Sequence, residues 1–201
     1  MTAGIYIHIP FCHRKCDYCS FYSVSVKDQG FTENHCNAFF NALVSEMRDR
    51  FESLGPLVVD SIYCGGGTPS IIEPAYYDTI LNLISTYCTI TPDVEISIEC
   101  NPLDISKEKL QALQSLGYTR FILGVQTLNR DINEAIGRSE LCPDTTQLDS
   151  FFNFKNILHC VDIITGIPQI EKKTHIQDIE EIVSYNPDHI SLYLLTVSDN
   201  T

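Results

Sequence analysis

The sequence predicts an α/β fold in which six parallel strands alternate with helices that pack outside the sheet. Two observations carry this prediction. Short segments repeat their apolar residues with a period of two, as strands do, and longer segments repeat them at spacings of three and four, as helices do. These two kinds of segment alternate along the chain with no internal repeat, low-complexity stretch or linker, so a single domain is expected.

The elements follow in chain order. Strands are predicted at residues 4–9, 58–63, 94–98, 120–125, 157–164 and 189–194. Helices are predicted at residues 33–54, 73–87, 106–116, 130–136, 146–154 and 174–184. Thr32 should cap the first helix and Gly55-Pro56 should end it, while Ser106 and Gly117 should do the same for the third.

Several strands alternate in polarity, which is unusual for a parallel sheet. Ile5, Ile7 and Ile9 alternate with Tyr6 and His8 in the first strand. A parallel strand buried on both faces normally reads as continuously apolar. The polar set is therefore expected to face a cleft inside a curved sheet.

The composition excludes some classes of function. The 201 residues carry a net charge of -13, and 44% of them are hydrophobic and 19% charged. Without a Lys/Arg cluster, the chain is not expected to bind nucleic acid. No apolar run approaches the length of a membrane span, and residues 5–11 are interrupted by His8 and Pro10 rather than forming a signal sequence. A cytoplasmic protein is expected.

Three of the nine cysteines, Cys12, Cys16 and Cys19, form a C-x3-C-x2-C run directly after the first strand. Three thiolates at one metal centre leave a coordination position open, which suggests chemistry rather than a structural role. An iron–sulfur cluster is favoured over zinc, for which His8 or His13 would have to supply a fourth ligand. The other six cysteines are scattered in apolar segments and are interpreted as small buried side chains.

Other unusual residues follow the predicted strands, at the edge of the sheet where ligands bind in such folds. They are Gly65-Gly66-Gly67-Thr68-Pro69-Ser70, Glu99, Gly124-Val125-Gln126, and Asp162 with Gly166-Ile167-Pro168. Consecutive glycines let a ligand approach the backbone, although a tight turn alone would also use them. Glu99 and Asp162 could accept hydrogen bonds from a ligand, or they could be buried partners of Arg120 or Arg138.

Taken together, these motifs resemble the radical S-adenosylmethionine (SAM) superfamily. The segments that carry the resemblance are IYIHIPFCHRKCDYCSF, GGGTPS, IECNP, GVQTLNRDINEAIGR, VDIITGIPQ and PDHISLYLLTVSDNT. Within the superfamily they are similar to the oxygen-independent coproporphyrinogen III oxidase group and its heme-chaperone relatives. The resemblance implies a partial (βα)6 barrel, with residues 1–201 forming the radical SAM core domain and the C-terminal domain of the family absent.

The resemblance also implies cofactors, partners and their contacts. Cys12, Cys16 and Cys19 would hold a 4Fe–4S cluster whose free iron binds SAM. The residues at SAM-contacting positions would be Tyr6, Tyr18, Gly66, Gly67, Thr68, Glu99, Gln126, Arg138 and Asp162. Heme or a porphyrinogen would be a further ligand, and reduced flavodoxin or ferredoxin would donate electrons.

One position distinguishes the two branches of this group. The oxidase typically carries a further cysteine two residues after the third, where this chain has Phe21. The resemblance therefore favours a heme chaperone that binds a cluster and SAM and delivers heme. The alternative is an enzyme, a coproporphyrinogen dehydrogenase-like oxidoreductase that decarboxylates porphyrinogen propionates through a 5′-deoxyadenosyl radical. A third hypothesis is an incomplete half that needs a partner.

Overall fold

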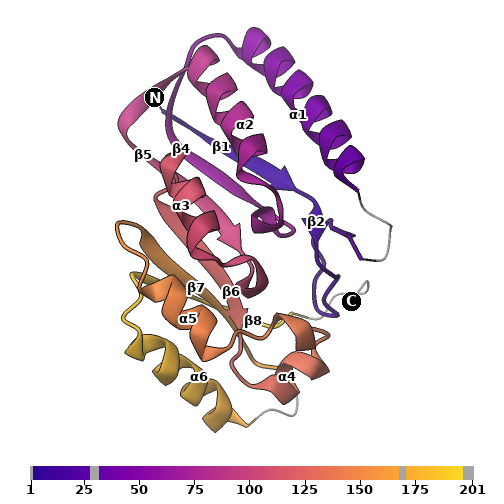
Figure 1. Cartoon of the computed structure of the whole chain (residues 1–201), viewed down its shortest axis with the longest axis vertical. Coiled ribbons are helices and arrows are strands. Elements are labelled where there is room, and N and C mark those ends of the chain that lie inside the picture. The colour runs from indigo at the N-terminus through magenta and orange to yellow at the C-terminus, as the bar shows by residue number, and fades with distance from the viewer. Residues whose placement is uncertain (1, 28–31, 168–170, 197–201) are drawn as a thin grey trace.

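The computed structural model describes residues 2–27, 32–167 and 171–196 (Figure 1). Its main sheet contains six strands, listed here in spatial order: β1 (Ala3–Ile9), β4 (Leu57–Gly66), β5 (Cys88–Cys100), β6 (Arg120–Gln126), β7 (Leu158–Thr165) and β8 (His189–Leu194). Every neighbouring pair is parallel. The sheet forms an open half-barrel, with β1 and β8 at its edges. The predicted parallel α/β fold is thus confirmed.

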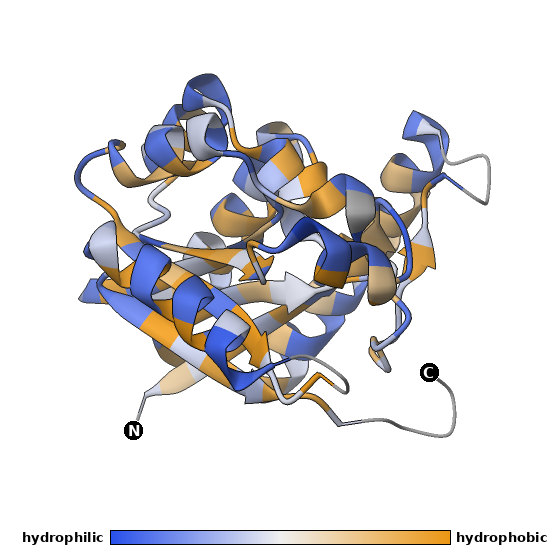
Figure 2. Ribbon diagram, turned by 90° about the horizontal axis from the view of Figure 1, so that it is seen from below, coloured by the Kyte–Doolittle hydropathy of each residue, from blue (hydrophilic) through white to orange (hydrophobic). Residues whose placement is uncertain are grey.

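Helices connect successive strands. They are α1 (Glu33–Leu54), α2 (Pro74–Tyr87), α3 (Lys107–Ser115), α4 (Arg130–Ala135), α5 (Thr145–Phe152) and α6 (Lys172–Ser184). Short 3-10 turns add η1 (Pro69–Ile71), η2 (Pro102–Asp104) and η3 (Ser139–Leu141). Figure 2 shows strands rich in hydrophobic residues and helices in which hydrophobic and hydrophilic residues alternate, as expected for helices that cover a sheet. In the part of the chain that the structure describes, no helix has both the length and the apolar character of a membrane span.

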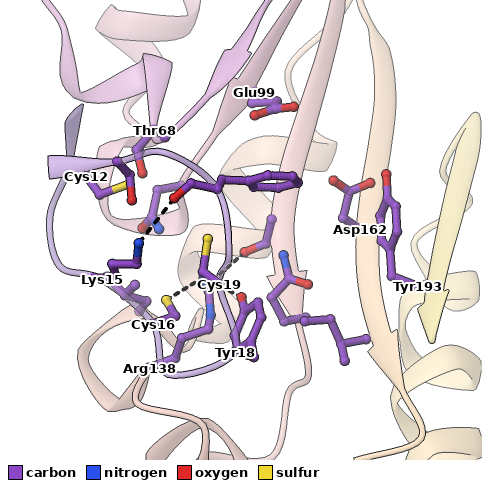
Figure 3. Close-up of a pocket in the computed structure, with 18 of the residues that line it drawn as sticks. Cys12, Lys15, Cys16, Tyr18, Cys19, Thr68, Glu99, Arg138, Asp162 and Tyr193 are labelled. Carbon is purple, nitrogen blue, oxygen red and sulfur yellow. Dashed lines mark hydrogen bonds between the residues drawn. The ribbon is translucent and has the colours of Figure 1, made fainter. Parts of the chain in front are cut away.

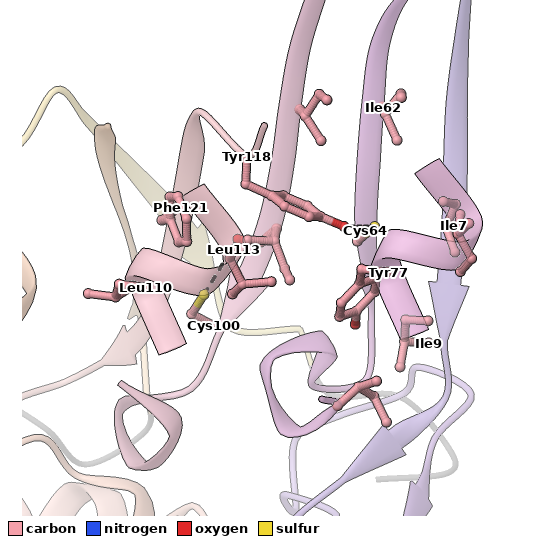
Figure 4. Packing of buried hydrophobic residues seen from close by; sticks show 14 of the residues in the cluster. Ile7, Ile9, Ile62, Cys64, Tyr77, Cys100, Leu110, Leu113, Tyr118 and Phe121 are labelled. Atoms are coloured by element: carbon pink, nitrogen blue, oxygen red, sulfur yellow. Dashed lines mark hydrogen bonds between the residues drawn. The ribbon is translucent and has the colours of Figure 1, made fainter. Parts of the chain in front are cut away.

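The core lies between the outer face of the sheet and the helices. In β1, Ile7 and Ile9 are buried, while Tyr6, which lies between Ile5 and Ile7, is exposed. The alternation seen in the sequence therefore separates the two faces of this strand. The other core residues shown in Figure 4 include Ile62 and Cys64 of β4, Tyr77 of α2, Leu110 and Leu113 of α3, Tyr118, and Phe121 of β6. Burial of this apolar surface is the main force that holds helices and sheet together.

Two tyrosine hydroxyls inside this core are paired. The Tyr77 hydroxyl donates to the Pro69 carbonyl at 2.7 Å, and the Tyr118 hydroxyl lies 3.2 Å from the Cys64 Sγ. Pairing removes most of the cost of burying a hydroxyl. Tyr77 also ties α2 to the turn after β4, so the glycine-rich segment at that turn rests directly on the core.

The predicted ends of the helices are confirmed where local caps define them. Gly55 follows α1 with φ 73°, and Gly117 follows α3 with φ 100°, both in the left-handed region that favours glycine. Thr32 is the N-cap of α1, and the Ser106 side chain accepts a hydrogen bond from the Lys109 N–H at 3.1 Å. The predicted bounds of α1 and β8 agree with the structure residue for residue.

The strand predicted at residues 94–98 is shorter than β5 in the structure. The strand begins at Cys88 and not at residue 94, because residues 88–90 pair with residues 57–59 before the register shifts ahead of the pair Ser61 and Glu95. Pro92 lies inside this irregularity, where proline is tolerated in a sheet. The turn-like residues around Pro92 concealed the first part of the strand.

Candidate functional site

A cavity of about 310 Å³ lies at the carboxyl ends of the strands. One side is the loop that carries the three cysteines, and the other is formed by strand-end residues Gly66 of β4, Glu99 of β5, Gln126 of β6, Asp162 of β7 and Tyr193 of β8. Figure 3 shows side chains from these distant segments turned toward one another. The predicted convergence of strand-end residues is confirmed.

The cysteine loop is anchored to the sheet by backbone hydrogen bonds. Strands β2 (Phe11–Cys12) and β3 (Val24–Ser25) form a short parallel ribbon at its base. The Gly67 N–H donates to the Ile9 carbonyl, and the Thr68 N–H donates to the Phe11 carbonyl, both at 2.7 Å. The segment after β4 therefore holds the loop in place as well as lining the cavity.

Gly67 is required by this close approach. A Cβ atom there would lie 2.7 Å from the Phe11 carbonyl oxygen, 2.9 Å from that of Ile9 and 3.0 Å from the Cys12 Sγ. Two of these contacts are with backbone, which has no freedom to move aside. The close packing against the backbone of Ile9 and Phe11 supports the tight-turn interpretation. Gly66 and Gly67 also line the cavity, and the approach of a ligand to them stays a prediction.

All three cysteines of the run line the cavity as free thiols. Cys12 and Cys16 are each 9% exposed. Burial raises the pKa of the Cys12 thiol, so bound metal or a nearby cation must favour its thiolate. The Arg138 guanidinium lies beside a different thiol of the run, with Nη1 3.8 Å from the Cys16 Sγ.

The zinc alternative is not favoured by the surrounding histidines. His8 Nε2 lies 2.9 Å from the Tyr22 carbonyl oxygen and its Nδ1 lies 3.2 Å from the Tyr6 hydroxyl. His13 Nε2 lies 2.8 Å from the Asp104 carboxylate. Within residues 2–27, 32–167 and 171–196, no three His, Cys, Asp or Glu side chains converge on a point where one ion could bind. A cluster differs from a single ion because each thiolate binds a separate iron.

Glu99 is held in place by two donors. Its carboxylate accepts a hydrogen bond from the Tyr63 hydroxyl at 2.7 Å and from the Gly66 N–H at 3.1 Å. Burial raises the pKa of Glu99, although these two bonds act in the opposite direction. A Cβ atom at Gly65 would lie 2.9 Å from the same carboxylate, which explains a third small residue at this position.

Asp162 faces the cavity with an incomplete set of partners. Its Oδ1 is buried and has no hydrogen-bond partner among the described residues. Burial raises the pKa of Asp162, and the Ser191 hydroxyl and the charges of His189 and Arg120 lower it to a smaller extent. An unpaired buried carboxylate oxygen is costly, so this atom is suited to a donor supplied by a ligand.

The suggestion that Glu99 and Asp162 pair with Arg120 or Arg138 is wrong. Arg120 pairs with Glu95 at 3.5 Å. Arg138 is 5% exposed and donates to the Gly124 carbonyl at 2.7 Å and to the Tyr18 hydroxyl at 3.5 Å, besides its contact with Cys16. Both carboxylates are therefore left on the strand side of the cavity, opposite Arg138 and Lys15 on the loop side (Figure 3).

Gln126 reaches the cavity through an irregular backbone. The register between β6 and β7 shifts between Gly124 and Gln126, and Gln126 has φ 68°. A positive φ is uncommon for a residue with a side chain and tends to persist where the structure uses it. The shift buries Val125 and leaves Gln126 on the cavity wall.

Of the other residues that the resemblance places at SAM-contacting positions, Tyr18 and Thr68 line the cavity and Tyr6 does not. Tyr6 is 59% exposed on the edge strand, and its ring stacks on Tyr63 with the ring centroids 6.0 Å apart. Its hydroxyl approaches His8 instead of the cavity.

Sequence reasoning missed Tyr193. It lies on the cavity wall, and its pKa is raised by burial and then by the Asp162 and Glu99 carboxylates. Tyr193 lies opposite Ile164 of β7, two residues beyond Asp162, and so shares its face of the sheet. This register is set by the pairing of β7 with β8 and cannot be read from either segment alone. The motifs ending in residues 168–169 and 197–201 extend outside the described residues.

A parallel half-barrel with three thiols and a polar cavity at its carboxyl edge defines a class of protein. Residues 6–182 match the family described as the radical SAM superfamily, and the chain belongs to this superfamily. Its cofactors are accordingly a 4Fe–4S cluster and SAM.

Three similar proteins show which group within the superfamily this chain resembles. The protein named heme chaperone HemW from Bacillus subtilis is 33% identical over 202 residues, which cover 98% of this chain and 51% of the relative. Heme chaperone HemW from Buchnera aphidicola subsp. Schizaphis graminum is 31% identical, covering 98% of this chain and 52% of the relative. The solved structure of coproporphyrinogen III oxidase (HemN) from Escherichia coli, a radical SAM enzyme, has a TM-score of 0.84 at 25% identity, covering 96% of this chain and 44% of that chain. The chain spans about half the length of these relatives.

The described residues fit both cofactors. Three thiols on one wall match a cluster with one open iron. The cationic loop wall and the anionic strand wall suit a ligand that, like SAM, carries both charges. Two buried polar atoms without a partner in the described chain, Asp162 Oδ1 and Arg138 Nε, leave hydrogen-bonding capacity for such a ligand.

Proposed function

We propose that this chain is the radical SAM core of a heme chaperone, which binds a 4Fe–4S cluster and SAM and delivers heme. The observation that carries the proposal is the cavity, where three cysteine thiols face an unpaired Asp162 carboxylate oxygen. The 31–33% identity to proteins named heme chaperone supports the choice of branch. Phe21, in place of the further cysteine typical of the oxidase, supports it as well.

Within this proposal each residue has a defined role. Cys12, Cys16 and Cys19 hold the cluster, and Arg138 stabilises negative charge on Cys16. Gly66, Gly67 and Thr68 let SAM approach the backbone, while Tyr18, Gln126, Glu99 and Asp162 orient it by hydrogen bonding and packing. A 4Fe–4S cluster held by these three cysteines would supply the electron for reductive cleavage of SAM. The protein's own contribution is to position SAM and keep water away.

Loss of single thiols tests the cluster assignment. Cys12→Ala, Cys16→Ala and Cys19→Ala should each abolish the visible absorption of the cluster after anaerobic reconstitution with iron and sulfide. Cys36→Ala and Cys88→Ala are matched controls, because both thiols are buried in the core away from the cavity, and they should retain the absorption. A reconstituted wild type without this absorption would contradict the proposal.

Coproporphyrinogen oxidase activity is the second candidate, favoured by the TM-score of 0.84 to the Escherichia coli oxidase. Anaerobic incubation with coproporphyrinogen, SAM and dithionite separates the two. Heme binding without decarboxylation supports the chaperone, and decarboxylation supports the oxidase. If heme does not bind and SAM is not cleaved, the chain requires a further partner to function.

A further inference from the structure

Among the described residues, Arg14 is the cation on the cavity wall that has no partner. It lies between the first two cysteines of the run, is half-buried and lines the cavity. No described residue forms a hydrogen bond or an ion pair with it. A guanidinium carries five N–H donors, and partial burial without an acceptor costs free energy.

The neighbouring cations are already engaged. Lys15 Nζ donates to the Phe21 carbonyl at 3.2 Å, and Arg138 is occupied by Cys16, Tyr18 and Gly124. Lys27, in the turn after β3 and outside the cavity wall, pairs with Glu140 at 3.3 Å. Among the described cavity-lining residues, Arg14 alone therefore has a complete set of free donors.

An exposed apolar surface borders the same cavity. Phe21 is 66% exposed and Leu194 is 74% exposed, and both line the cavity from opposite sides, one on the cysteine loop and one on β8. A large exposed aromatic ring and an unpaired cation that line one cavity suit a ligand with a flat apolar face and an acidic group. The net charge of -13 disfavours binding of an anionic ligand to most of the surface. An unpaired cation at the cavity therefore favours binding of such a ligand there.

We propose that Arg14 binds a carboxylate of the ligand and that Phe21 packs against the ligand's flat face. This inference rests on the proposed heme function, in which the carboxylate is a heme propionate and the face is the porphyrin ring. The planar guanidinium fork matches a carboxylate through two parallel hydrogen bonds. The carboxylate of SAM has the same chemistry, and the experiment separates the two sources.

The test compares heme with heme dimethyl ester, which has the same ring but no free propionates. The full chain and its Arg14→Ala, Phe21→Ala and Lys27→Ala variants are titrated with each ligand. Wild type should bind heme about tenfold or more tightly than the ester, as expected for a charge-assisted pair. Arg14→Ala should lose this preference, Phe21→Ala should weaken both ligands alike, and Lys27→Ala should behave as wild type. Thermal unfolding and cluster absorption verify that each variant is folded.

Two outcomes overturn the inference while the proposed function stands. In one, wild type binds heme and Arg14→Ala keeps the full preference over the ester. In the other, Arg14→Ala weakens binding of SAM and leaves heme binding unchanged, which assigns the carboxylate to SAM. Failure of the wild type to bind either porphyrin would instead overturn the proposed function, and this inference with it.

Discussion

At the scale of single residues, the site places charges where folding alone does not favour them. Asp162 and Glu99 are buried enough to raise their pKa values, and Asp162 Oδ1 lacks a partner in the described chain. Two positively charged groups also lack a partner in the described chain: Arg138 Nε, which is buried, and Arg14, which is half-buried. Such groups destabilise the ligand-free protein and become favourable only when a ligand supplies the missing partner.

Asp162→Asn should therefore stabilise the ligand-free protein while weakening SAM binding. The amide removes the buried charge, and we expect a gain on the order of 1 kcal/mol in the free energy of unfolding. Urea unfolding without cofactors and SAM titration of the reconstituted protein measure the two effects.

Asp49→Asn is the matched control, because Asp49 is exposed on α1 far from the strand ends in the sequence. Its stability and SAM affinity should stay close to those of wild type. If Asp162→Asn unfolds at lower urea than wild type, desolvation of the carboxylate is not the dominant effect.

At the scale of elements, local sequence signals define most helix ends. Irregularities in the strands, in contrast, determine where some of the cavity-lining residues lie. α3 begins at a serine cap and is followed by a glycine with positive φ, both readable from the sequence. By contrast, the register shift in β6 that brings Gln126 to the cavity has no comparable signal. It depends on how β6 packs against β7.

Ser106→Ala should destabilise the protein by about 1 kcal/mol, because the Lys109 N–H loses its acceptor at the start of α3. Ser115→Ala, at the other end of the same helix, is the control. The Ser115 hydroxyl donates only to the Gln111 carbonyl within the helix, and alanine favours helix formation. Equal effects of the two substitutions in urea unfolding would show that the cap contributes nothing.

At the scale of the whole molecule, the net charge of -13 and the buried carboxyl groups act together. Glu99, Asp162 and Asp178 all have raised pKa values, with burial as the main cause. Near and above its pKa in the unfolded state, each of these carboxyl groups binds more protons in the folded state than in the unfolded state. The free energy of unfolding therefore decreases as pH rises through the folded pKa values.

The melting temperature of the ligand-free protein should accordingly rise as pH is lowered through the raised pKa values toward the ordinary carboxyl range near 4. Weaker repulsion between the remaining negative charges acts in the same direction. Thermal unfolding at constant ionic strength measures the slope, and Asp162→Asn should make it shallower. A melting temperature that falls steadily over this interval would refute the explanation.

Local patterns in the sequence predict the alternating strands and helices, the helix caps, the cysteine run and the set of residues at the strand ends. These features follow from short-range spacing and local backbone chemistry, which are written in consecutive residues. The packing of the whole molecule set the rest: Tyr6 lies outside the cavity, Tyr193 lines it, and neither Asp162 Oδ1 nor Arg14 has a partner among the described residues. Those outcomes depend on sheet curvature, register shifts and distances between segments far apart in the chain, which packing sets and no local pattern encodes.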